Sequence, residues 1–287
     1  MREPKVKWIF VLPAVTYILV ITIFPLVWSL SLAFTDWKLT RASEPQFVGI
    51  QNFERLLMND KRFGNALSFT ALYVSIATLV ELALGLALAL ILHSKTRGAR
   101  VMRIFFLIPL AVPPIGTAFM WRMLLQEDVG LVNAALSLLN IGKIRWFTDP
   151  WTARLGLIMI DIWQWTPFMF LALLAAISAI PAEPQEAALI DGATRWGVIR
   201  HVVLPLISPV IITIVLIRCI DAFKLFDYVY GVTGGGPGTT TESASYYIYL
   251  LGRVYFDLGY ASSASYILLI IMLGLSTIIL WRLRRTW

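Results

Sequence analysis

The sequence has few charged residues and a single cysteine. Charged residues fill 14% of its 287 positions and hydrophobic residues 59%, whereas a soluble domain has roughly 25% charged and 45–50% apolar residues. The lone cysteine, Cys219, excludes a disulfide within the chain. The two histidines, His93 and His201, stand far apart and have no cysteine or carboxylate at a metal-ligand spacing, so the sequence predicts no metal site.

Several motifs that carry chemistry are also missing. No G-x-x-x-x-G-K-[ST] loop is present to hold nucleotide phosphates, and no nucleophile elbow or H-E-x-x-H helix occurs. The net charge of +7 is spread over short loops instead of forming a basic stripe with aromatic residues, which argues against nucleic-acid binding. The sequence therefore predicts no catalytic residue and no cofactor bound by this chain.

Long apolar stretches are present instead. A helix needs about 20 mostly apolar residues to cross a bilayer, and six stretches meet this condition. They lie at approximately 8–34, 66–92, 104–120, 155–180, 209–231 and 262–281. Backbone groups cannot stay unpaired in lipid, so these spans should be helices. We predict an all-α, polytopic membrane protein with six transmembrane helices in one transmembrane domain covering residues 1–287.

The loops differ in their density of lysine and arginine, which indicates orientation because basic residues favour the cytoplasmic side. The denser set contains both termini, the 93–103 loop and residues 181–208, and we expect it to be cytoplasmic. The longer loops face outside in this prediction, at 35–65, 121–154 and 232–261.

The segment EAALIDGATRWGVIRHVVLPLISP, at 186–209, is too polar to cross a bilayer. It predicts a short helix over 184–191 that stops at Gly192, because glycine adopts a left-handed conformation at little cost. A second helical run follows, with apolar residues along one face, and Pro205 should end it. From the residues alone two interpretations stay open: an amphipathic helix pair on the inner leaflet, or a docking element for a cytoplasmic partner.

Charged residues interrupt the apolar spans. Glu81 is the only charge of the second span, Asp161 lies in the fourth, and the fifth contains Arg218, Asp221, Lys224 and Asp227. Asp221, Lys224 and Asp227 recur at i, i+3, i+6, which puts them near one helical face. A charge that faces lipid costs several kcal/mol, so this face should look into the bundle or a watery cavity. The charges fit either a solute site or an internal Asp221–Lys224 ion pair.

Four stretches resemble one family. EAALIDGA, followed by LP twelve residues after Gly192, resembles the EAA loop of permease subunits in binding-protein-dependent ABC importers. IPLAVPP, FTDPWTA and DAFKLFDYVYGVTGGGPGTTTESASYYIY are similar to the maltose/multiple-sugar group of these permeases. The likeness covers nearly the whole chain. The GGP loop with its following TTTESA is more similar to the first of the two paired permease subunits.

The resemblance implies a type I ABC importer permease fold in a bacterial or archaeal cytoplasmic membrane. It implies an ATP-driven importer of a sugar or oligosaccharide. The partners would be a second permease subunit that completes a heterodimer, an ATPase dimer that binds ATP and Mg at the cytoplasmic loop, and an extracytoplasmic solute-binding protein. The chain itself would then be no enzyme.

The resemblance also assigns roles to residues. It implies that the ATPase-coupling residues are Glu186, Ala187, Ala188, Asp191 and Gly192. Trp163 and Phe168 match sugar-contacting positions, although tryptophans also form interfacial belts. The predicted substrate pathway consists of these two residues with Asp161, Asp221, Lys224 and Asp227. Residues of a flexible outer loop are expected to contact the binding protein, namely Gly234, Gly235, Gly236 and Pro237. A solvated turn without a partner is the alternative for this loop.

Other functions fit parts of the sequence. An importer of a glycerol-phosphate-type solute would use a similar permease. Charges within a span also suit ion coupling in a self-sufficient secondary transporter, but the six spans show no inverted repeat. A membrane transferase that acts on polyprenyl substrates would need an acidic cluster in a cytoplasmic loop, and none occurs.

Overall fold

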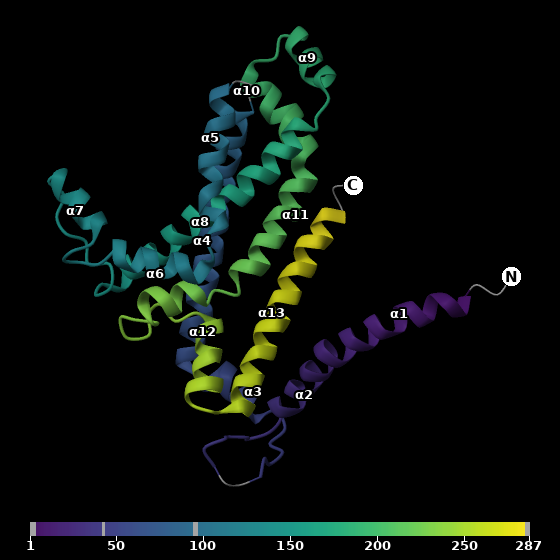
Figure 1. Ribbon diagram of the computed structural model, residues 1–287, viewed down its shortest axis with the longest axis vertical. Helices are drawn as coiled ribbons and strands as arrows, with labels where there is room; N and C mark the ends of the chain where they lie inside the picture. Colours follow the sequence, from purple (N-terminus) through teal and green to yellow (C-terminus); the bar gives the residue numbers. More distant parts are fainter. Residues whose placement is uncertain (1–3, 42–43, 94–96, 285–287) are drawn as a thin grey trace. The chain divides into compact units, whose positions relative to one another are not determined.

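The computed structural model describes residues 4–41, 44–93 and 97–284. Residues 94–96 of the predicted 93–103 loop therefore lie outside the described residues. Within those ranges the chain is mostly helical, with two isolated β-bridges and no named strand. Figure 1 follows the helices in chain order.

Packing divides the chain into two units, which are Met1–Gly64 with Tyr247–Ile271, and Asn65–Tyr246 with Met272–Trp287. The first unit contains α1 (Pro4–Ile18), the π turn η1 (Leu19–Ile23), α2 (Phe24–Ala33), α3 (Gln51–Glu54), η2 (Arg55–Asn59), η6 (Leu250–Val254) and the start of α13 (Leu258–Arg284). Most of the second unit is formed by α4 (Lys61–Leu92), α5 (Arg97–Leu107), η3 (Ile108–Ala111), α6 (Pro114–Leu124), α7 (Leu131–Leu138), α8 (Pro150–Ser178), α9 (Ala182–Ile190), α10 (Arg195–Val198), η4 (Ile199–Val203), α11 (Leu204–Ala222), η5 (Val229–Thr233) and α12 (Ala244–Tyr249).

Asp60 organises the polar part of the first unit. Its carboxylate accepts hydrogen bonds from the hydroxyls of Tyr247 and Tyr260, at 2.7 and 2.8 Å, and from the backbone N–H of Phe63 at 2.9 Å. Burial alone would raise the pKa of Asp60, but these hydrogen bonds hold the pKa below its ordinary value. The carboxylate therefore stays ionised and joins segments that are far apart in the sequence.

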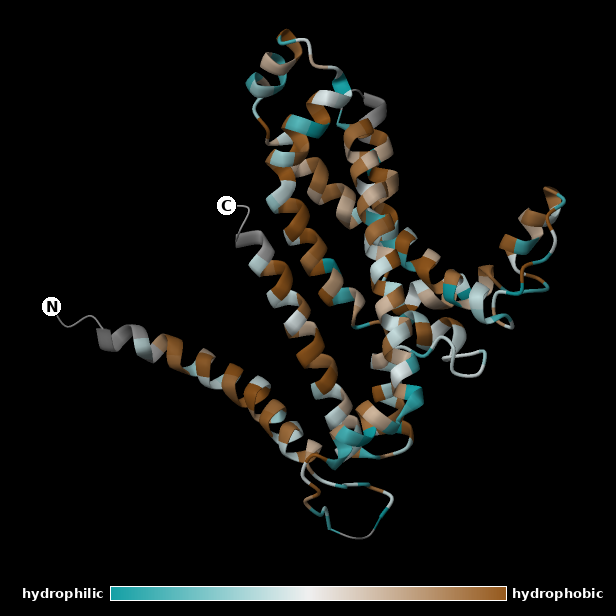
Figure 2. Cartoon of the chain, turned by 180° about the vertical axis from the view of Figure 1, so that it is seen from behind, coloured by the Kyte–Doolittle hydropathy of each residue, from teal (hydrophilic) through white to brown (hydrophobic). Residues whose placement is uncertain are grey.

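Five helices are long and apolar enough to cross a membrane, at Phe10–Ala33, Lys61–Leu92, Pro150–Ser178, Arg195–Ala222 and Leu258–Trp281. They overlap the first, second, fourth, fifth and sixth predicted spans. Figure 2 shows hydrophobic residues along most of their length. The first of these helices has none of its apolar window buried within the chain, so its hydrophobic surface needs lipid or another protein around it.

The third predicted span, 104–120, contains a sharp break at its proline-rich stretch. Two shorter segments, Val101–Ala111 and Pro114–Leu124, meet at an angle of 97°. Val112 between them has an extended backbone, with φ −87° and ψ 130°. Proline lacks an N–H and disfavours helical geometry in the residue before it, so Pro113 breaks the helix. The bent pair counts as a sixth span only if its two halves together cross the membrane once.

The fifth predicted span, 209–231, is also corrected. The helix runs from Arg195 to Ala222. Pro205 does not end the preceding helical run, because it occupies the first turn of α11 directly after the π turn η4. A proline is tolerated in a first turn, where its missing N–H is not needed. The predicted second helix of the 186–209 segment is thus continuous with the span.

Close packing brings α4 and α8 together in the second unit. A Cβ atom added at Gly85 would lie 2.6 Å from the Cβ of Met169, so only glycine allows this approach. The buried core around this contact draws on α4, α8 and α11, and includes Ala89, Leu173 and Ile214. The middle parts of three helices are therefore held against one another, and their polar side chains must satisfy each other there.

Candidate functional site

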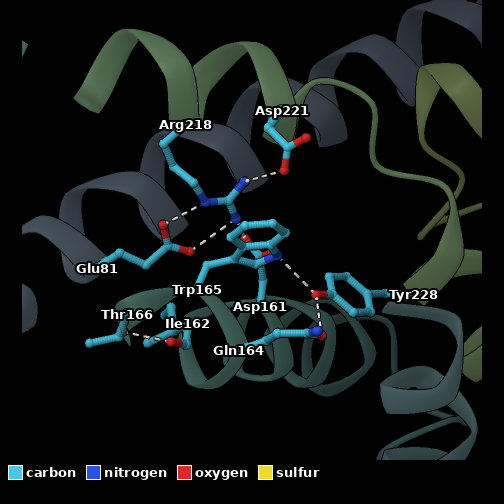
Figure 3. Close-up of polar contacts among 9 residues, drawn as sticks. All are labelled: Glu81, Asp161, Ile162, Gln164, Trp165, Thr166, Arg218, Asp221 and Tyr228. Atoms are coloured by element: carbon cyan, nitrogen blue, oxygen red, sulfur yellow. Dashed lines mark hydrogen bonds and ion pairs between the residues drawn. The ribbon is translucent and has the colours of Figure 1, made fainter. Parts of the chain in front are cut away.

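A buried group of charges joins α4, α8 and α11 (Figure 3). The Arg218 Nε donates to Glu81 Oε2 at 2.8 Å, and its Nη2 donates to Glu81 Oε1 at 3.0 Å and to Asp161 Oδ2. The three side chains are 1%, 0% and 2% exposed. The guanidinium also lies over the ring of Trp165, 5.1 Å from its centroid. Buried charges are very costly unless they are paired and hydrogen-bonded, so these residues depend on one another.

A chain of hydrogen bonds continues from this group. The indole N–H of Trp165 donates to the Tyr228 hydroxyl at 3.1 Å, and that hydroxyl donates to Gln164 Oε1 at 2.7 Å. The Gln164 amide then donates to the carbonyl oxygen of Val112 at 2.6 Å. This carbonyl lies at the proline break between α5 and α6, so Gln164 stabilises the bend.

A cavity of about 300 Å³ opens beside the buried charges. Its charged lining consists of Asp161, Arg218, Asp221, Lys224 and Asp227. The prediction that the last three share one helical face is wrong, because α11 ends at Ala222. They still meet at one cavity because the chain turns around it after the helix ends.

The proposed internal ion pair takes a different form. Asp221 Oδ2 lies 3.6 Å from Nη1 of Arg218, and its side chain is 44% exposed. Among the described residues, no ion pair links Asp221 to Lys224, which is exposed. Asp227 is half-buried. In the same described ranges, no three His, Cys, Asp or Glu side chains are grouped to hold a metal ion.

Trp163 and Phe168 do not line this cavity. Trp163 contributes to a separate apolar groove of about 570 Å³, with Phe105 and Pro167 among its lining residues. Phe168 packs edge-on against Trp165 and against the buried core. Each residue of a helix turns by about 100°, so positions two apart point to nearly opposite sides and positions four apart share a side. Trp165, four residues after Asp161, therefore faces the charges in place of Trp163.

The predicted coupling segment is an exposed helical turn. None of the residues of α9 is buried, and the side chain of Ile190 is 85% exposed. Gly192 ends the helix with φ +86°, and a Cβ added there would meet nothing within 4 Å. Glu186, Ala187 and Asp191 are exposed, whereas Ala188 is half-buried against the core. The predicted turn at Gly192 is confirmed as a backbone feature; a docking role for it stays a prediction.

The glycine-rich loop after η5 is not a free linker. The Thr241 hydroxyl donates to the Gly236 carbonyl at 2.7 Å, and the Tyr246 hydroxyl donates to the Gly234 carbonyl at 3.0 Å. Gly235 is buried, and a Cβ there would come within 2.8 Å of Glu242. Outside this turn, Arg154 Nε donates to the Thr240 carbonyl at 2.8 Å. The loop is thus hydrogen-bonded to itself and to the first part of α8, contrary to the expected flexibility.

Sequence reasoning missed the partners in the buried group. It noted Glu81 as the only charge of its span and Arg218 as one of four charges in the fifth span. It did not pair them, and it did not single out Tyr228. Opposite charges that lie in different apolar spans are a usable signal, because each needs a partner within the bundle. Tyr228 carries no such signal, since a tyrosine in an apolar stretch is ordinary.

Comparison with known proteins agrees with this architecture. Residues 81–285 match the family model described as binding-protein-dependent transport system inner membrane component. The trehalose/maltose transport system permease protein MalF of Thermococcus litoralis is 38% identical over 258 residues, which is 90% of this chain and 85% of that protein. The probable ABC transporter permease protein YesP of Bacillus subtilis is 32% identical over 290 residues, which is 100% of this chain and 92% of that protein.

Solved structures share the fold. A chain of a bacterial ABC transporter involved in the import of the acidic polysaccharide alginate superposes with a TM-score of 0.85 at 24% identity, covering 98% of this chain and 95% of that one. At this identity the likeness concerns the fold alone. The family match spans most of the sequence, and so the chain belongs to the inner membrane components of binding-protein-dependent transport systems.

Proposed function

We propose that this chain is one permease subunit of an ATP-driven importer that translocates a sugar or oligosaccharide. The observation that carries the proposal is one helix, α8, which contributes Asp161 and Trp165 to the polar cavity and leads within a few residues into the exposed α9. A force applied to α9 would therefore cross the short turn at residues 179–181 and reach the cavity along α8. The named function of the Thermococcus relative, trehalose and maltose transport, supports the sugar class.

The proposal includes three partners. A separate ATPase dimer binds α9, a second permease subunit covers the apolar surface of α1 and α2, and a solute-binding protein contacts the outer loop at Gly234, Gly235, Gly236 and Pro237. ATP and Mg are bound by the ATPase. The exposed apolar side chains of α9 and its surroundings, Leu189, Ile190 and Trp196, suit a protein contact.

Uptake by the reconstituted complex tests the function. The chain is co-purified with its partner subunits, placed in liposomes with ATP inside, and supplied with loaded binding protein and labelled maltose or trehalose. Accumulation that requires both ATP and the binding protein is expected. Accumulation of labelled glycerol phosphate alone would favour the phosphate-type solute, and uptake without an ATPase would favour a secondary transporter.

Two neighbouring alanines offer a matched test of the ATPase contact. A photo-crosslinker on Ala187→Cys should react with the ATPase, because Ala187 is exposed on α9. The same probe on Ala188→Cys should react much less, because Ala188 packs against the core. Both variants are made in a Cys219→Ala background. Equal reaction with lipid from both sites would contradict docking.

The orientation of the chain is tested by labelling. We propose that both termini and α9 are cytoplasmic. A membrane-impermeant maleimide should label Thr240→Cys in intact cells but label Arg200→Cys only after the membrane is permeabilised, because the loops around Arg200 carry the denser basic charge. Labelling of Arg200→Cys in intact cells would reverse the orientation.

Arg154 is expected to hold the outer loop in shape for the binding protein. Its guanidinium donates to the Thr240 carbonyl and lies over the ring of Trp151, 5.5 Å from the centroid. A hydrogen bond from a charged donor contributes roughly 1.5–3 kcal/mol. Arg154→Met should therefore weaken stimulation of ATPase activity by the binding protein by roughly tenfold while basal ATPase activity persists. Arg154→Lys should recover part of it, and equal stimulation in all three proteins would exclude this role.

Trp163 and Trp165 form a matched pair for the pathway. Trp165→Ala should slow uptake by roughly tenfold, because it removes a cation–π contact worth roughly 1–2 kcal/mol. The sequence predicts solute contact for Trp163 as well, but this side chain faces the apolar groove, and Trp163→Ala should change uptake by less than about threefold. Assembly is followed by size-exclusion chromatography. A larger effect of Trp163→Ala with intact assembly would put the solute in the apolar groove.

A further inference from the structure

More negative than positive side chains surround the polar cavity. Glu81 and Asp161 contact Arg218 directly, and the cavity lining adds Asp221, Asp227 and Lys224. Four carboxylates thus face two cationic groups, which leaves two uncompensated negative charges when all are ionised. All of these residues belong to one packing unit of the chain.

The single arginine cannot serve as an anion site. Its Nε and Nη2 donate to Glu81 and Asp161, and its Nη1 lies 3.6 Å from Asp221. Its side chain is only 1% exposed. A carboxylate or phosphate on a solute would have to displace one of these acids to reach the guanidinium, and the displaced acid would lose its partner inside the protein.

The accessible groups are mostly acidic. Asp221 is 44% exposed and Asp227 is half-buried, and both line the cavity with the exposed Lys224. Ionised carboxylates accept hydrogen bonds and have none to give. They suit hydroxyl groups, which donate, and they repel anions. At an effective dielectric constant of about 20, repulsion between an anionic solute group and a carboxylate about 5 Å away weakens binding on the order of a hundredfold.

We propose that this cavity is a selectivity site that admits uncharged, hydroxyl-rich solutes and disfavours carboxylated or phosphorylated ones, with Asp221 and Asp227 as the discriminating groups. This inference rests on the proposed function and narrows it to neutral sugars. Trp165 also lines the cavity, and the part of its ring not covered by Arg218 would meet the C–H groups of a sugar ring.

Binding to the transporter without its binding protein tests the proposal directly. The full complex is placed in lipid nanodiscs, and equilibrium dialysis measures the Kd of labelled maltose and of maltobionate, which carries a carboxylate at one end. The wild-type complex should bind maltose about tenfold or more tightly than maltobionate. In the double variant Asp221→Asn/Asp227→Asn, the ratio of the maltobionate Kd to the maltose Kd should fall to about threefold or less, because asparagine keeps the shape and removes the charge.

Two further variants make the outcome specific. Lys224→Met removes a positive charge from the cavity and should raise the ratio. Asp128→Asn removes a carboxylate that is 89% exposed and does not line the cavity, and it should leave the ratio unchanged. If the double variant does not assemble, Asp227→Asn alone should still lower the ratio.

The possible failures are distinct. Equal affinity of the wild type for both probes, an unchanged ratio in the charge variants, or no binding of either probe would overturn the selectivity site even if the complex accumulates maltose in liposomes. Absence of ATP-dependent sugar accumulation would instead overturn the proposed function.

Discussion

Replacing Arg218 with methionine is expected to prevent stable assembly of the permease. The change leaves Glu81 and Asp161 buried without their shared cation. Removing one partner of a buried ion pair costs about 3–5 kcal/mol, which is a large part of the stability of a typical domain. Arg218→Lys should be intermediate, because a lysine ammonium cannot form the bidentate contact that Arg218 makes with Glu81.

Yield and thermal midpoint of the purified complex measure this effect. The matched control is Arg218→Met combined with Glu81→Met and Asp161→Leu, which removes the three charges together and keeps similar volumes. It should recover much of the lost assembly, because well-packed apolar groups of similar volume often replace a buried ion pair at little cost. If Arg218→Met alone is as stable as the wild type, the three charges do not support one another.

Placing an aspartate at Gly192 is expected to abolish transport while membrane insertion survives. The turn is exposed, and a Cβ at Gly192 would meet nothing within 4 Å, so bulk alone does not explain a defect in the isolated chain. The new carboxylate would stand next to Asp191, and both would lose water when a partner covers α9. Burying an unpaired charge in an interface is very unfavourable.

An asparagine at the same position isolates the charge. Gly192 has φ +86°, and asparagine adopts positive φ more readily than most side chains. Gly192→Asn should therefore retain much of the transport, whereas Gly192→Val should lose it through backbone strain. Uptake, ATPase stimulation and co-elution with the ATPase are compared for all three variants. Normal transport by Gly192→Asp would remove the support for docking at this turn.

Features that depend on neighbouring residues were predictable from the sequence. The apolar spans around residues 66–92 and 155–180 follow from length and composition, because lipid demands helices there. The turn at Gly192 follows from one residue that tolerates positive φ at low cost. IPLAVPP contained the signal for a break as well, but a helix with prolines can either bend slightly or turn sharply, and the local sequence does not distinguish the two.

Features that depend on partners far along the chain were decided by the tertiary structure. The sequence requires that Glu81 and Arg218 each have a charged partner, but 137 positions separate them. Only the packing of α4 against α8 and α11 brings the two together. The same packing decides that Trp165 and not Trp163 faces the charges. It also brings Asp227, which follows the end of α11, to the cavity that Asp161 lines. The type of a side chain determines that it needs a partner inside the membrane. Which residue can be that partner depends on which helices pack together.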